Sequence, residues 1–90
     1  MPLPDSKPRL APHVRRQNDR VTGAAMLLHP EGAVELSDTA DAIVQFCDGE
    51  RTTREIVSAL AAQYEVEPDV LRADVDACLE ALIERSLIVA

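Results

Sequence analysis

The sequence predicts an α+β fold: a small three-stranded antiparallel sheet followed by a three-helix bundle, as in a winged helix-turn-helix domain. Residues 10–36 alternate short apolar stretches with clusters of turn-forming residues, a pattern typical of strands joined by hairpins. Residues 37–86 place apolar residues at helical spacing in three segments. With 90 residues, 47% hydrophobic, the chain fits one small domain; one Phe, one Tyr and no Trp make its core aliphatic.

Three strands are expected, at Leu10–Arg16, Val21–Leu28 and Ala33–Leu36. Residues 17–19 form a turn cluster between the first two. Pro30-Glu31-Gly32 supplies the second turn, because Pro presets φ and Gly accepts a positive φ. Alternation along the third strand then places its two larger apolar side chains on one face and its glutamate on the other.

Each helix has a start signal. Ser37 or Asp38 can cap the first helix, and Gly49 is expected to follow its end as the C′ residue. Thr52-Thr53-Arg54-Glu55 is a capping box that opens the second. Glu67-Pro68-Asp69 opens the third, with proline at the first helical position. The expected apolar faces are Ala40, Ile43, Val44, Phe46 and Cys47 in the first helix, Ile56, Val57, Leu60 and Tyr64 in the second, and Leu71, Val75, Cys78, Leu79, Leu82 and Ile83 in the third.

The two ends of the chain are expected to differ from this core. Ser86 ends the third helix, and Leu87-Ile88-Val89 forms a final strand or a packed tail. Residues 1–8 hold three prolines and are expected to be a flexible tail before a domain at residues 9–90.

Charge is distributed unevenly along the chain. Residues 1–20 have a net charge of +3, and residues 21–90 have a net charge of -10. The acidic body would repel nucleic acid and anionic membranes, so neither is expected as a partner. The basic arm is expected to pack on this body, to meet an acidic partner, or to stay mobile in solvent.

The expected compartment is the cytoplasm. No apolar run reaches the ~18 residues of a membrane span, and the N-terminus lacks the apolar region of a secretory signal. Cys47 and Cys78 fall where helical cores are expected, which favours buried apolar residues over a disulfide or metal site.

No motif for catalysis or cofactor binding is found. The chain has no nucleophile elbow, P-loop or dinucleotide fingerprint. His13 and His29 have no second ligand at short metal spacing, and His29 fits a turn better than a metal site. We therefore expect no enzymatic activity, metal or cofactor.

Two other small-domain classes are disfavoured. A DNA-reading third helix should be basic, whereas here it carries Asp69, Asp74, Asp76, Glu80 and Glu84 against Arg72 and Arg85. An acyl carrier protein needs Asp-Ser-Leu at its prosthetic-group serine. Ser37 lies instead in Leu36-Ser37-Asp38, where a helix cap explains it.

The segments Leu27–Leu36 and Cys47–Ile56 resemble the PqqD family of pyrroloquinoline quinone (PQQ) biosynthesis. The likeness extends over residues 9–89, with a weaker match in the third helix at Asp74-Val75, Leu79 and Leu82. It departs at Ser86, where the family commonly has Gly, and at Ser37-Asp38, where Asn is frequent. Both are local changes at caps or turns that leave the fold intact.

The resemblance implies a peptide chaperone and not a catalyst. Family members bind the precursor peptide PqqA and present it to PqqE, a radical S-adenosylmethionine enzyme that crosslinks a Glu and a Tyr in the peptide. The peptide lies along the third strand and beside the third helix, a case of β-strand addition. The site residues implied here are Ala33, Val34, Glu35, Leu36, Leu71, Val75, Cys78 and Leu79.

Several alternatives stay open. Val34, Leu36, Val75 and Leu79 also fit plain core packing. The fold would equally suit a recognition element for another peptide-modifying enzyme, of the lasso-peptide or cyclodehydratase type. An exposed edge strand would permit a homodimer. Docking on the partner enzyme is assigned to the basic arm, at Arg9, Arg15, Arg16 and Arg20.

Overall fold

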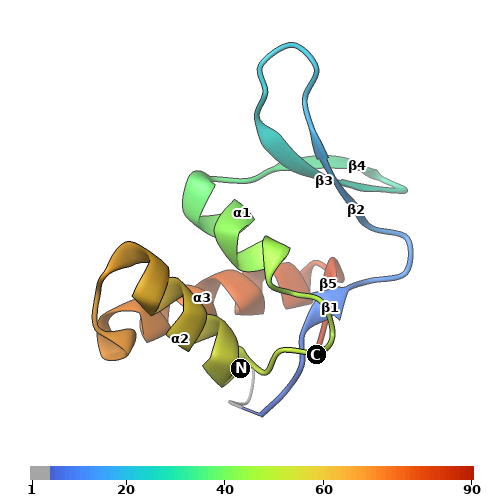
Figure 1. Ribbon diagram of the computed structural model, residues 1–90. Helices are drawn as coiled ribbons and strands as arrows, with labels where there is room; N and C mark the ends of the chain where they lie inside the picture. Colours follow the sequence, from blue (N-terminus) through green and yellow to red (C-terminus); the bar gives the residue numbers. More distant parts are fainter. Residues whose placement is uncertain (1–4) are drawn as a thin grey trace.

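The computed structural model describes residues 5–90, and its three helices and three-stranded antiparallel sheet confirm the predicted α+β fold (Figure 1). A second sheet of two strands was not expected. The elements in chain order are β1 (Arg9–Leu10), β2 (Arg15–Asn18), β3 (Ala25–His29), β4 (Gly32–Glu35), α1 (Asp38–Gln45), α2 (Thr53–Tyr64), α3 (Pro68–Glu84) and β5 (Ile88–Val89).

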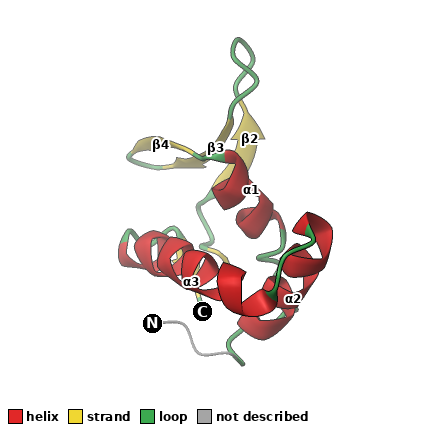
Figure 2. Cartoon of the chain, turned by 90° about the vertical axis from the view of Figure 1, so that its left-hand side faces the viewer, coloured by secondary structure: helices red, strands yellow, loops and turns green. Residues whose placement is uncertain are grey.

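The larger sheet has the order β2-β3-β4, so strands adjacent in the chain are adjacent in space. β3 pairs with β4 in the register Leu27↔Val34 and Leu28↔Ala33. The sheet lies at one end of the molecule, with α1 beneath it and α2 and α3 further away (Figures 1 and 2). The smaller sheet pairs β1 with β5 and so joins segments near the two ends of the chain.

The expected strand at Leu10–Arg16 is wrong. A turn at Pro12-His13 divides it: Leu10 belongs to β1, where it pairs with Ile88, while β2 extends from Arg15 into the residues expected to be a turn. The division has a tertiary cause, because the strand that captures Leu10 lies at the far end of the chain.

The second strand begins later than expected, because residues 20–24 form the turn of the β2–β3 hairpin. The carboxylate of Asp19 accepts hydrogen bonds from the N–H groups of Val21 at 2.7 Å and Thr22 at 3.1 Å. Val21 is 93% exposed at the tip of this protruding hairpin. The strand prediction for residues 21–24 is therefore wrong.

The start of α1 is capped by Ser37, whose hydroxyl accepts a hydrogen bond from the N–H of Ala40 at 3.1 Å. The expected stop at Gly49 is wrong, since α1 ends at Gln45 and Phe46 is its C-cap. Gly49 lies in the following loop with φ +79°, and its N–H donates to the carbonyl of Pro8 at 3.0 Å.

The capping box of α2 is confirmed. The N–H of Glu55 donates to the Thr52 hydroxyl at 3.1 Å, and the N–H of Thr52 donates to the Glu55 carboxylate at 2.8 Å. Tyr64 does not join the core as expected but is 44% exposed, because the helix ends there in a turn whose next residue, Glu65, is left-handed.

The end of α3 forms a Schellman motif around Ser86, which has φ +60°. The N–H of Ser86 donates to the carbonyl of Ile83 and the N–H of Leu87 to that of Leu82, both at 2.9 Å. This turn directs the chain into β5. Ser86 thus occupies the left-handed position for which glycine is best suited.

One hydrophobic cluster joins the sheet to the helices. At its centre the side chains of Leu27, Ile56, Val75 and Leu79 are 0% exposed. No helix in the described part of the chain is long and apolar enough to cross a membrane.

The predicted tail is described in part. Residues 1–4 lie outside the described residues. Ser6 and Pro8 lie against the loop before α2 and its first residues: the N–H of Thr53 donates to the carbonyl of Ser6 at 2.9 Å, and Pro8 is buried.

Candidate functional site

The outer edge of β4 carries free backbone groups. The N–H of Leu36 donates to the carbonyl of Ala25 at 2.8 Å. Because hydrogen-bond direction alternates along an antiparallel pair, the amides of Val34 and Leu36 point toward β3, and those of Ala33 and Glu35 point away from it. Among the described strands none pairs with this edge. It therefore presents the N–H and C=O groups of Ala33 and Glu35 to any added strand.

The two faces of β4 differ in chemistry. Val34 is half-buried and Leu36 is 8% exposed, and both pack against the core on the same face as Leu27. Ala33 and Glu35 are exposed on the opposite face. A strand added at this edge would therefore turn alternate side chains inward, next to Val34, and the others outward to solvent.

The α3 residues implied as peptide contacts are mostly core residues here. Val75 and Leu79 are 0% exposed, and Leu71 is 8% exposed. Cys78 is half-buried and leaves part of its surface accessible. Core packing thus accounts for Val75 and Leu79 in this structure, and their contact with a peptide stays a prediction.

The β3–β4 hairpin and the C-terminal part of α3 lie on the same side of the molecule in both views (Figures 1 and 2). Where the turn of the hairpin meets the end of α3, the surface is hollowed by about 520 Å³. Residues 29–31 from the turn and residues 85–87 after α3 line this hollow. A concave surface therefore lies beside the turn at the hairpin end of β4.

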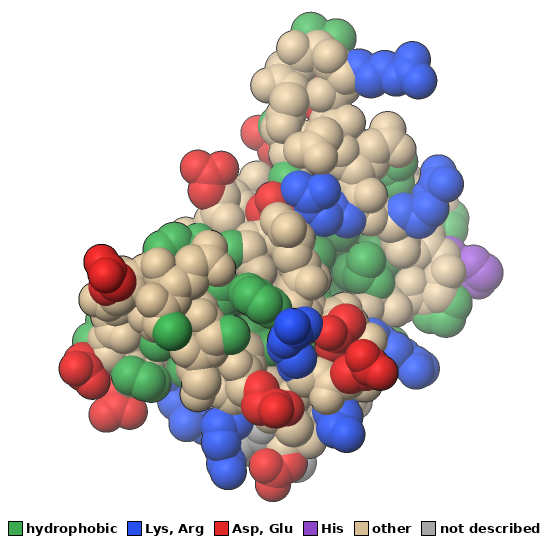
Figure 3. All heavy atoms as spheres, in the orientation of Figure 1, with side chains coloured by type: hydrophobic (Ala, Val, Ile, Leu, Met, Phe, Trp, Pro, Cys, Tyr) green, Lys and Arg blue, Asp and Glu red, His purple; other side chains and the backbone are tan. Residues whose placement is uncertain are grey.

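The four arginines assigned to docking do not form one patch. Arg9 lies in β1, Arg15 is exposed in β2, and Arg20 is exposed in the β2–β3 turn. On the face shown in Figure 3, Lys and Arg side chains are spread from the protruding hairpin to the opposite end of the molecule. Any docking surface would use only some of them.

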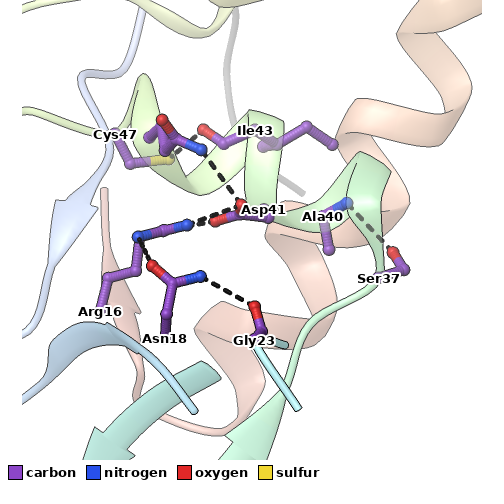
Figure 4. Close-up of polar contacts among 9 residues, drawn as sticks. Arg16, Asn18, Gly23, Ser37, Ala40, Asp41, Ile43 and Cys47 are labelled. Carbon is purple, nitrogen blue, oxygen red and sulfur yellow. Dashed lines mark hydrogen bonds and ion pairs between the residues drawn. The ribbon is translucent and has the colours of Figure 1, made fainter. Parts of the chain in front are cut away.

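Arg16 has a structural contact instead. Its Nη2 donates to Oδ2 of Asp41 in α1 at 2.8 Å, and its Nε donates to Oδ1 of the same carboxylate (Figure 4). The hydrogen bonds from Arg16 lower the pKa of Asp41. Asn18 extends the contact, accepting a hydrogen bond from Nη1 of Arg16 at 3.2 Å and donating to the carbonyl of Gly23 at 3.1 Å. This network holds the sheet on α1.

The cysteines are both unpaired thiols. Cys47 is buried and its Sγ donates to the carbonyl of Ile43 at 3.3 Å (Figure 4). Burial raises the pKa of Cys47 to about 12 and also raises the pKa of Cys78. Neither thiol is therefore activated as a nucleophile. Within residues 5–90, no group of three His, Cys, Asp or Glu side chains is placed to hold a metal ion.

Comparison with known proteins identifies the family. The model of the family "Coenzyme PQQ synthesis protein D (PqqD)" matches residues 24–88. This chain belongs to the PqqD family. The resemblance found in the sequence is thereby confirmed.

Individual relatives agree with this family. A "PqqA binding protein" of Xanthomonas axonopodis pv. citri is 37% identical over 84 residues, which cover 93% of this chain and 91% of the relative. The solution structure of the PqqD part of Methylobacterium extorquens PqqCD, described as a functional, stand-alone recognition element for ribosomally synthesized, modified peptides, superimposes with a TM-score of 0.79. It is 31% identical and covers 92% of this chain and 88% of its own.

A relative from another system shares the fold. Lasso peptide synthetase B1, solved in complex with its leader peptide, superimposes with a TM-score of 0.78 at 26% identity. The match covers 94% of this chain and all of that one. The same architecture therefore occurs in a protein of a different peptide pathway.

The hollow at the end of the hairpin was missed in the sequence. His29 was interpreted as a turn residue, and Arg85 as part of the mixed charge of the third helix. Their proximity depends on the position of the hairpin turn relative to the end of α3, and no local sequence pattern specifies that position. The turn at Pro30-Glu31-Gly32 was the available signal, since it fixes where the hairpin ends.

Proposed function

We propose that this chain is a peptide-binding protein of PQQ biosynthesis, which binds the precursor peptide PqqA as an added strand on β4 and presents it to the radical S-adenosylmethionine enzyme PqqE. The observation that carries the proposal is the free edge of β4, with the amides of Ala33 and Glu35 turned outward. Backbone hydrogen bonds along such an edge supply affinity, and pockets for alternate side chains supply specificity.

The names of the relatives support the choice of peptide. The Xanthomonas protein is named for binding PqqA, and the Methylobacterium domain is described as a recognition element. In the proposed complex, inward side chains of the peptide lie beside Val34 and Cys78, which are partly accessible. Contact with Val75 or Leu79 requires the hairpin or α3 to move on binding, since both side chains are fully buried.

The test compares two substitutions at one position. Glu35→Pro removes an outward N–H while leaving the bonds from Val34 and Leu36 to β3 in place, and proline is tolerated on the solvent side of an edge strand. Glu35→Ala removes the carboxylate and keeps the N–H. We expect Glu35→Pro to weaken PqqA binding about tenfold or more and Glu35→Ala to change it less than twofold.

Two measurements make this test decisive. Circular dichroism must show both variants folded, and amide shifts in a titration with labelled protein map the site. Shifts at residues 33–36 and 70–83 support strand addition. Shifts confined to α1 and α2, or equal binding by both variants, would show that the peptide binds elsewhere.

The second part of the proposal concerns the enzyme. Exposed Arg15 and Arg20 lie on or beside the sheet, and residues 21–90 carry a net charge of -10. An electrostatic contribution from either surface predicts that affinity for PqqE falls as salt rises. A dissociation constant unchanged between low and high salt would contradict it. Arg20→Glu reverses an exposed charge of the basic arm, and Arg54→Glu in α2, where the side chain is 64% exposed, is the control outside that arm.

A second candidate function has one specific observation in its favour. The similarity to lasso peptide synthetase B1 bound to its leader is nearly as close as that to PqqD. This candidate is a recognition element for another peptide-modifying enzyme. Competition between PqqA and a lasso leader peptide for the labelled protein separates the two, because the true peptide displaces the other at lower concentration.

The same free edge allows a homodimer through pairing of β4 with β4 of a second copy. Peptide and dimer would then compete for the same backbone groups. Sedimentation velocity with increasing peptide tests this: dimers formed through β4 dissociate as PqqA is added, whereas dimers formed elsewhere do not.

A further inference from the structure

The hollow between the hairpin turn and the end of α3 is built from three separate segments. Val14 and His13 come from the connection before β2, His29 and Glu31 from the β3–β4 turn, and the segment after α3 supplies Arg85 and Leu87. Its volume is about 520 Å³. Segments from both ends of the chain and its middle thus meet at one concave surface.

The floor and the rim of the hollow differ. Val14 and Leu87 are 8% and 2% exposed, so the apolar floor is already nearly closed to solvent. His13, Glu31 and Arg85 are exposed around it. The lining that stays accessible is mostly apolar, so apolar groups of a ligand would contact it while polar groups meet the rim.

The charges on the rim are not equivalent. The carboxylate of Glu31 already has a partner, since its Oε2 lies 3.0 Å from Nδ1 of His29. Arg85 makes no ion pair within residues 5–90. Its guanidinium carries five N–H donors in a fork that matches a carboxylate. The charged rim group that is free to bind a ligand is thus the cation Arg85.

The hollow lies beyond the hairpin end of β4: the turn residues 29–31 line it, and no residue of β4 itself does. Alternation along β3 places His29 on the same face as Leu27, and Leu27 is opposite Val34 on β4. The inward side chains of a strand paired with β4 lie on this same face. A peptide that continues past the hairpin end of β4 on this face would come to the turn residues His29 and Glu31, which line the hollow.

We propose that this hollow binds a carboxylate of the bound peptide, held by Arg85 with His13 beside it. The inference rests on the proposed function, because it takes the peptide to lie along β4. It adds a chemical requirement for one position: an acidic side chain of the peptide, or its C-terminal carboxylate if the chain ends there.

The experiment measures whether the effects of a change in the protein and of a change in the peptide depend on each other. PqqA peptides in which each acidic residue is replaced in turn by its amide, and one with an amidated C-terminus, are titrated into the wild-type protein and into Arg85→Gln. Arg72→Gln is the matched control, since Arg72 is exposed on the same helix and makes no ion pair within the described residues. We expect one peptide change to weaken binding to the wild type and to Arg72→Gln about tenfold, and to leave binding to Arg85→Gln unaltered.

The outcomes separate the two proposals. Coupling at one acidic residue identifies a side chain as the source, and coupling only with the amidated peptide identifies the C-terminus. If no peptide change couples to Arg85 while Glu35→Pro still weakens binding, the carboxylate inference is wrong and the strand-addition function stands. If PqqA does not bind near residues 33–36 at all, both proposals fall.

Discussion

The ion pair between Arg16 and Asp41 should contribute measurably to stability, because it joins the sheet to α1. The side chains are 28% and 17% exposed, and the guanidinium binds the carboxylate through both Nε and Nη2. Fully exposed pairs contribute about 0–1 kcal/mol, whereas bidentate, partly buried pairs are stronger. We therefore expect a coupling free energy of about 1–2 kcal/mol from the double-mutant cycle of Arg16→Ala and Asp41→Ala.

The assay is urea unfolding followed by circular dichroism, with the free energy of unfolding taken from the midpoint at an unchanged m-value. The pair Asp48–Arg51 is the control, since its side chains are more exposed, at 34% and 45%. Because it is an exposed pair in the loop before α2, its coupling should be below about 1 kcal/mol. If the Arg16–Asp41 coupling is no larger than that of the control, the sheet is held on α1 by apolar packing alone.

The same pair predicts a dependence on pH. The hydrogen bonds from Arg16 lower the pKa of Asp41 in the folded protein below its unfolded value, which is about 3.9. The stabilisation is therefore fully present above the unfolded pKa and is lost as pH falls through the folded pKa. The stability difference between wild type and Asp41→Asn should be constant from pH 7 to about pH 5 and should shrink toward pH 2. A difference that does not change in this range would contradict the assignment.

Three further predictions concern local features. Ser86→Gly should raise the free energy of unfolding by about 0.5–1 kcal/mol, because the strain of a left-handed serine that it removes exceeds the entropy that the more flexible glycine loses on folding. A lower urea midpoint would contradict this. Thr52→Ala should lower it by about 1 kcal/mol through loss of the capping box, and retained stability would show that Glu55 alone suffices. At pH 8 a thiol reagent should modify half-buried Cys78 before Cys47, whose pKa is raised to about 12, as peptide mass spectrometry can establish; equal rates would indicate opening of the core.

Local signals predicted the elements whose causes are local. The capping box at Thr52 and the proline at the start of α3 each fix a helix start through neighbouring residues alone. The faces of β4 followed from simple alternation, with Leu36 buried and Glu35 exposed as expected. These features depend on hydrogen bonds or spacing within a few residues, so a sequence window contains all the information needed.

The errors share a different origin. The sequence pattern predicts Leu10 in the same strand as Arg16, but its partner in the structure is Ile88, almost the whole chain away. The sequence predicts Gly49 as a helix stop, whereas its positive φ allows the contact of the loop with Pro8 and Arg9. In each case a distant segment determined the local conformation, and no window around the residue contains that segment.

In the candidate site, too, local sequence patterns predict some features, and the position of distant segments determines the others. The helical spacing of Val75 and Leu79 predicts that these apolar side chains are buried, but it does not show whether the domain itself or a bound peptide buries them. In this structure the domain does. The free edge of β4, where we propose that the peptide binds, has a topological basis instead. A strand such as β5 requires hydrogen bonds to a neighbouring strand. Had β5 paired with β4, it would have blocked the outward amides of Ala33 and Glu35. β5 pairs with β1 instead, so the two-stranded sheet leaves the edge of β4 free for another chain.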